Sequence, residues 1–193
     1  PEDRYEMRDI YQLYAKHHPT FTADGIYNLS KELDTVIYFE ALSEVSVRVS
    51  HDLFISKEMI SFDTDAVDRA INSFLSKDYI RIREIDSFLV FPNVGYEWNE
   101  YLLESFLLSY SKKFALVNNG LSLNNVAGFV VKEDGQIKEF VDACAAFLAD
   151  GRIELKKVDA LNYLADMNII SRRSYKDIDL ALRRAAQIRR RKE

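Results

Sequence analysis

Residues 71–92, INSFLSKDYIRIREIDSFLVFP, constrain the fold more than any other stretch, because a helical pattern leads directly into two β-rich runs and a proline stop. A helix can begin at Asp63 or Thr64, with Val67 and Ile71 on its buried face. The runs 79–82 and 88–91 flank a charged turn, which predicts a hairpin over residues 79–91.

Most of the remaining chain has helical spacing, and its six glycines and three prolines in 193 residues leave little room for long loops. Helices are predicted over 3–17, from Thr22, in the apolar stretch after Pro92, and over most of the chain after residue 136. Residues 38–53 contain VSVRV, which alternates like a strand, but their apolar and polar rows at helical spacing favour a helix. A second hairpin is expected at 114–131, around Asn118 to Gly120. The predicted class is mainly α (α+β).

The order of three helices and a hairpin over about residues 22–92, ending in FLSKDYIRI and FLVFP, resembles the winged-helix superfamily. The resemblance implies a winged-helix-like fold for this stretch. We expect two domains, a winged-helix-like domain over 1–92 and, over 93–193, a helical domain with a small hairpin and a basic C-terminal helix. In winged helices that bind DNA, the third helix enters the major groove. Here that helix would expose Asp63, Asp65 and Asp68. We therefore expect this corner to be structural or protein-binding.

No arrangement of residues predicts catalysis. The histidines at 17, 18 and 51 lack zinc-like spacing, no Gly-rich phosphate loop is present, and Cys144 lies in the apolar run FVDACAAFL, where a core position is expected. We predict no catalytic residue, no metal, no cofactor and no enzymatic activity. No apolar run is long enough for a membrane span, and a single cysteine fits a reducing, cytoplasmic setting. The start at Pro1 suggests a piece of a longer chain.

Positive charge gathers at the C-terminal end. Residues 172–193 contain nine basic and three acidic side chains, a net charge of +6, so the first 171 residues carry −11 of the total of −5. The stretch ALNYLADMNIISRRSYKDIDLAL resembles a helix-turn-helix whose second helix starts near residues 171–174. The candidate nucleic-acid-binding residues are Arg172, Arg173, Ser174, Lys176, Arg183, Arg184, Arg189 and Arg190.

Two interpretations of this basic end stay open. In the first, the protein is a nucleic-acid-associated regulatory module that docks through its basic C-terminal helix pair. In the second, it is a protein–protein interaction or regulatory region of a larger multidomain protein. The arginines would then only solvate a helix end and complement its dipole. The expected partners are accordingly a nucleic acid, a protein, or the rest of a longer chain.

Overall fold

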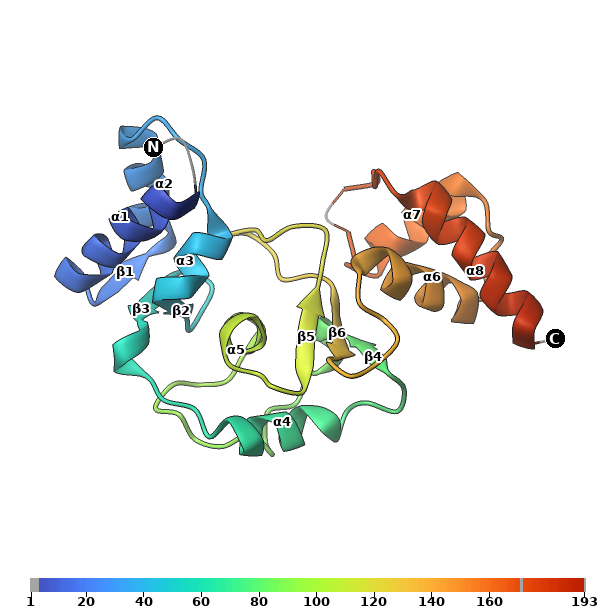
Figure 1. Ribbon diagram of the computed structural model, residues 1–193, viewed down its shortest axis with the longest axis horizontal. Coiled ribbons are helices and arrows are strands. Elements are labelled where there is room, and N and C mark those ends of the chain that lie inside the picture. The colour runs from blue at the N-terminus through green and yellow to red at the C-terminus, as the bar shows by residue number, and fades with distance from the viewer. Residues whose placement is uncertain (1–3, 171, 193) are drawn as a thin grey trace. The chain divides into compact units, whose positions relative to one another are not determined.

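The computed structural model describes residues 4–170 and 172–192, which divide into two compact units (Figure 1). The first unit holds the chain up to Asn72 together with Asp86–Lys112 and Ser122–Val126, and the second holds Ser73–Ile85, Lys113–Leu121 and the chain from Ala127 onward. The expected single boundary between residues 92 and 93 does not reproduce this division, because the chain returns to each unit more than once. The described residues form eight α-helices and two three-stranded antiparallel sheets, a mixed α and β fold.

The first unit begins with α1 (Arg4–His17), β1 (Thr20–Thr22) and α2 (Ala23–Glu32). The predicted N-cap of the second helix is confirmed, because the Thr22 hydroxyl accepts a hydrogen bond from the Gly25 amide at 3.1 Å. Buried side chains from these elements form one apolar cluster with residues farther along the chain. Its members include Met7, Tyr11, Phe21, Ile26, Leu42 and Phe54.

The predicted helix over 38–53 is wrong in its second half. Helix α3 (Phe39–Val45) ends where β2 (Ser46–Arg48) begins, and β2 pairs with β3 (Leu53–Ser56), which also pairs with β1. The polar row that indicated a helix comprises Glu40, Glu44, Arg48 and Asp52. A helix would place this row on its polar face, yet Arg48 is only 4% exposed. Its guanidinium donates hydrogen bonds to backbone carbonyls, including that of His51, and lies 4.1 Å from the Tyr101 ring centroid. The burial of Arg48 removes one of the four members of the polar row that indicated a helix.

The first unit is completed by the 3-10 turn η1 (Lys57–Met59), α4 (Thr64–Asn72) and α5 (Glu100–Ser109). Asp63 caps α4, as expected, by accepting from the Ala66 amide at 2.9 Å. Trp98 and Phe106 are buried within the first unit. The Trp98 ring meets Phe91 and Phe62, both in the same unit, at centroid distances of 4.9 and 5.9 Å.

The sheet of the second unit has the order β4 (Tyr79–Arg81), β6 (Phe129–Lys132), β5 (Phe114–Val117), and the 3-10 turn η2 (Ile82–Glu84) follows β4. Pairing of β5 with β6 confirms the hairpin at 114–131. The hairpin at 79–91 is wrong, because β4 pairs with β6 and residues 88–91 form no strand. The winged-helix resemblance relied on that hairpin and is not confirmed. Gly128, at φ +120°, is required where a Cβ would lie 2.5 Å from the Val117 carbonyl oxygen.

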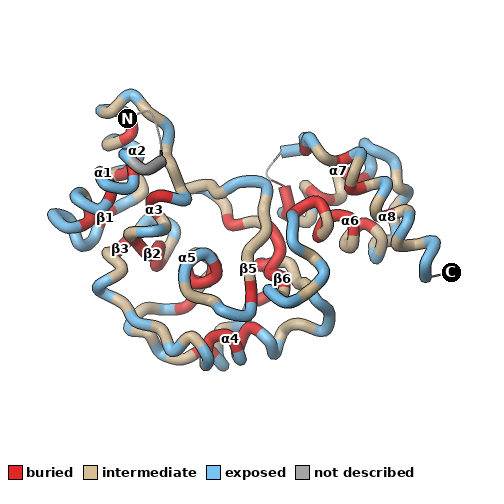
Figure 2. The backbone as a smooth tube through the Cα atoms, viewed as in Figure 1, coloured by how far each residue is buried: buried red, intermediate tan, exposed pale blue. Residues whose placement is uncertain are grey.

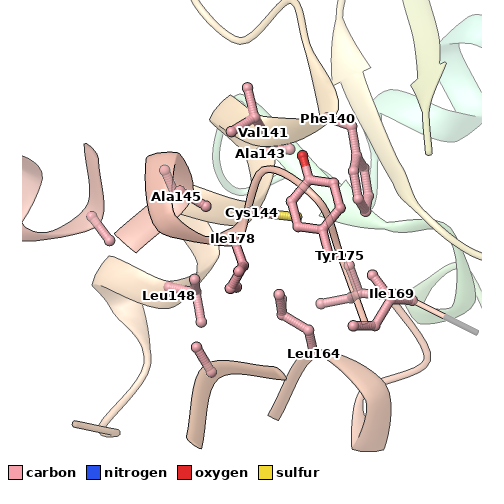
Figure 3. Packing of buried hydrophobic residues seen from close by; sticks show 14 of the residues in the cluster. Phe140, Val141, Ala143, Cys144, Ala145, Leu148, Leu164, Ile169, Tyr175 and Ile178 are labelled. Carbon is pink, nitrogen blue, oxygen red and sulfur yellow. The ribbon is translucent and has the colours of Figure 1, made fainter. Parts of the chain in front are cut away.

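Three helices complete the second unit: α6 (Phe140–Asp150), α7 (Lys157–Asp166) and α8 (Ile178–Lys192). Helices α6 and α8 pack along each other, and alanines on both, such as Ala143 and Ala181, allow their backbones to approach closely. The buried apolar side chains of the second unit form one cluster. Figure 3 shows Cys144 in this cluster, close to Tyr175 and Ile178, which confirms its predicted core position. Figure 2 shows red positions on α8 alternating with pale blue ones, so one side of this helix is buried and the other faces solvent.

Candidate nucleic-acid interface

The basic residues lie on two adjoining parts of the second unit, the connection 167–177 and helix α8. The second helix was expected to start near residues 171–174, but α8 begins at Ile178, so Arg172, Arg173 and Lys176 precede it. This connection is longer than the three or four residues typical of a helix-turn-helix. The arginines therefore cannot project from the first turn of a recognition helix, as that motif would require.

Buried residues fix the connection to the core. Ile170 is 2% exposed and Tyr175 is 8% exposed. The Tyr175 ring meets the edge of Phe140 on α6 at a centroid distance of 5.3 Å and an angle of 78°. Between and beside these anchors, Arg172, Arg173 and Lys176 are exposed. Arg172, Arg173 and Lys176 thus face solvent close to two buried residues, Ile170 and Tyr175.

Ser174 lies in the same connection and is exposed. It had been expected to start α8 and to take part in base recognition. In the structure it lies before the turn at residues 176 and 177, and the first turn of α8 is closed instead by a bond from the Ala181 amide to the Asp177 carbonyl. Its hydroxyl is therefore available to a ligand without being aimed by a helix terminus.

The helix itself separates its basic residues into two groups according to the face they occupy. Ile178, Ala181 and Ala185 are its buried side. At about 100° per residue, Arg183 and Arg190 fall on the opposite side, and both are exposed. Two helical turns place them ~10 Å apart along the axis. Gln187 lies between them and is also exposed.

Arg189 lies next to the buried side of α8 and forms hydrogen bonds within the second unit. Its guanidinium donates hydrogen bonds to the backbone carbonyls of Leu148, Ala149, Gly151 and Ile153, at 2.7 to 3.1 Å. The last carbonyls of α6 have no partner within that helix, so this side chain caps its C-terminal end. Arg189 is thus a structural residue of the second unit, a role that sequence reasoning missed because the partners are some forty positions away.

Three other cations near the same end are paired with carboxylates. Arg184 forms an ion pair with Asp142 on α6, and Lys192 binds Asp150 at 2.6 Å. Partial burial by itself would raise the pKa of Asp150, but hydrogen bonds from Lys192, Lys77 and Tyr79 outweigh it and lower that pKa to about 2. Arg173 lies 3.7 Å from Asp166, and both side chains are about two-thirds exposed. Such an exposed pair contributes little and is readily exchanged for another anion.

Five cations of this region are exposed and have no ion pair within residues 4–170 and 172–192: Arg172, Lys176, Arg183, Arg190 and Arg191. We call this set the basic surface. Arg191 was not among the predicted site residues, although the run of basic residues at 189–192 was a signal for it. Three nearby carboxylates are paired with other cations: Asp142 and Asp150 on α6 with Arg184 and Lys192, and Asp179 on α8 with Lys157.

A thiol and a cavity of the second unit are candidate reactive features. Burial raises the pKa of the Cys144 thiol, so it is held in the protonated, unreactive form. A cavity of about 430 Å³ lies beside Asp150, but the Lys77 and Tyr79 side chains that line it already bond to that carboxylate. Within the described ranges no cluster of three metal-ligating side chains occurs.

Comparisons of the chain with protein-family models, with curated proteins and with solved structures gave no match. Among the helices of residues 4–170 and 172–192, none has both the length and the apolar character needed to span a bilayer.

Proposed function

We propose that the second unit docks on the phosphate backbone of a nucleic acid through the basic surface, as a non-enzymatic module. The observation that carries this proposal is the set of five exposed cations without an intramolecular counterion, on one anchored connection and one face of α8. Exposed guanidinium and ammonium groups of this kind bind phosphates by displacing condensed counterions. Arg173 joins them by exchanging its exposed pair with Asp166 for a phosphate.

The proposed contact is independent of base sequence. Phosphate contacts position a protein, whereas base contacts require side chains that reach into a groove from a helix or strand. Arg172 and Lys176 lie in a connection, and the N-terminal turn of α8 contributes the buried Ile178. Arg183 and Arg190, ~10 Å apart along α8, are far enough apart to contact two different phosphates.

The experiment is a fluorescence anisotropy titration of a short labelled duplex and a single-stranded RNA of equal length, repeated at several salt concentrations. If all five cations contact phosphates, the logarithm of the binding constant should fall with the logarithm of salt with a slope of about −4.5 on duplex DNA. Replacing Arg183 and Arg190 together by Gln should reduce that slope by about 2 and weaken binding to every sequence alike.

A matched control removes the same charge elsewhere. Lys31 and Arg69 are exposed basic residues on α2 and α4 of the first unit and have no ion pair among the described residues. The Lys31→Gln, Arg69→Gln double variant should retain the wild-type slope. An equal loss in both double variants would show a general charge effect. Absence of wild-type binding at low salt would refute the proposal.

The second candidate function, a protein-interaction or regulatory region, is favoured by a different observation. Leu89 is 95% exposed and its neighbour Val90 is 62% exposed, while Phe88 and Phe91 beside them contact Trp98. Exposed apolar side chains on a loop that is supported by packed aromatic rings are a common form of protein contact site. Sedimentation of the wild type and of a Leu89→Ser, Val90→Ser variant at increasing concentration would test whether this loop mediates self-association.

A further inference from the structure

The first unit contains a cavity of about 1030 Å³ that the basic surface does not involve. Side chains from α1, from the end of α3, from the end of β3 and from η1 line it. Those that decide its chemistry are Arg8, Lys16, Glu44, Val45, Lys57 and Met59. All of them lie in the described part of the chain and within one unit.

Lys57 is the side chain that points to a ligand. It is half-buried at the start of η1, and it has no ion pair within residues 4–170 and 172–192. Its ammonium nitrogen lies 5.3 Å from the centroid of the Tyr110 ring. Burial lowers the pKa of Lys57, and the charge of Glu44 opposes that effect only in part. A partly desolvated ammonium group without a bonded anion is unfavourable, and a bound anion would relieve this cost.

Glu44 does not take that role, because it already has a cationic partner. The Arg8 Nε atom lies 3.4 Å from the Glu44 Oε2 atom, across the space between α1 and α3. The charged lining comprises three cations, Arg8, Lys16 and Lys57, against the carboxylates of Glu44 and Glu58. The cavity therefore carries a small positive excess. Within residues 4–170 and 172–192 neither Lys16 nor Lys57 has an ion pair, and of these two Lys57 is the half-buried one.

We propose that this cavity binds a small organic anion, a phosphate ester or a carboxylate, whose charged group pairs with Lys57. Its volume is at the upper end of the range of ligand pockets, ~300–1,000 Å³, and far exceeds that of an inorganic ion. Val45 and Met59 supply apolar surface for the body of such a molecule. Met59 is 45% exposed, so this surface is open to a ligand from solvent.

The test uses phenyl phosphate as the probe and follows the three methionines, labelled with ¹³C at their methyl groups, by NMR. Met59 lines the cavity, whereas Met7 is fully buried in the core and Met167 lies in the second unit. Phenyl phosphate should shift the Met59 signal saturably and leave the Met167 signal unchanged. Benzoate tests the carboxylate arm, inorganic phosphate tests the charged group alone, and uncharged benzyl alcohol tests the apolar surface alone.

Lys57→Met should weaken phenyl phosphate binding roughly tenfold or more, as expected for loss of one charge-assisted hydrogen bond. Lys31→Met, on the exposed side of α2 and outside the cavity, should bind as the wild type does. The Lys57→Met variant should unfold at no lower temperature than the wild type, because it removes a partly buried charge, so weakened binding cannot be ascribed to misfolding. Equal binding by benzyl alcohol, undiminished binding by Lys57→Met, or no saturable shift of Met59 with either anion would overturn the proposal.

Discussion

Arg189 offers the sharpest test of how the basic end divides between structure and binding. Its guanidinium donates to the carbonyls of Leu148, Ala149, Gly151 and Ile153 at the end of α6. Arg189→Met keeps an apolar stem of similar reach and removes all of these donors. Hydrogen bonds to a charged group contribute about 1.5–3 kcal/mol each, but these four are only partly buried, so water can replace some of the lost donors. We expect the free energy of unfolding to fall by about 2–4 kcal/mol in total.

Arg190→Met is the matched control, since it removes the same group one position along α8, where the side chain is exposed and has no partner in the described structure. Its effect on the free energy of unfolding, measured by urea denaturation, should lie within ~0.5 kcal/mol. Nucleic-acid titrations should show the opposite order of effects. Arg190→Met should weaken binding, whereas Arg189→Met, measured below its unfolding transition, should not. Equal and small stability losses would refute the capping role of Arg189.

Two further predictions concern the first unit. Burial raises the pKa of Glu104 to about 7, against the opposing effect of Arg48, so the folded state holds a proton that the unfolded chain releases near its ordinary value of 4.5. The contribution of Glu104 to the free energy of unfolding is therefore fully present below about pH 4.5 and is lost, by up to ~3 kcal/mol, as the pH rises through 7. Urea denaturation at several pH values should show this decline in the wild type and not in Glu104→Gln. If the free energy of unfolding varied with pH in the same way in the wild type and in Glu104→Gln, the protonation of Glu104 in the folded state would be contradicted. Trp98→Ala or Phe106→Ala should cost ~3–5 kcal/mol, and a near-neutral effect on thermal melting would show that their ring contacts do not support the core.

Local features were predictable from the sequence because they depend on residues close together in the chain. The caps at Thr22 and Asp63 each join atoms three residues apart. The burial of Cys144 follows from the apolar run around it. In each case a side chain and its immediate neighbours contain all the information that the prediction needs.

Features that depend on distant partners were not predictable. Strand β4 was identified by its composition, but its partner β6 lies some fifty residues later and nearer apolar runs competed for it. Arg48 has the composition of a surface residue and becomes buried because carbonyls at Ser122 and Leu123 accept its hydrogen bonds. The same holds at the candidate site, where the number of arginines was evident from the sequence but their division into paired, capping and exposed groups was not.

The pairing of β4 with β6 bears on the order in which the protein can fold during synthesis. Ser73–Ile85, which contains β4, leaves the ribosome long before Phe129–Lys132, and the intervening chain includes Asp86–Lys112 of the first unit. A nascent chain that stops short of residue 129 therefore has a strand whose central partner does not yet exist. Long-range pairing of this kind closes a large loop and is slow to form. The first unit can complete its own segments by residue 126, so it has the opportunity to fold while the second still awaits its middle strand.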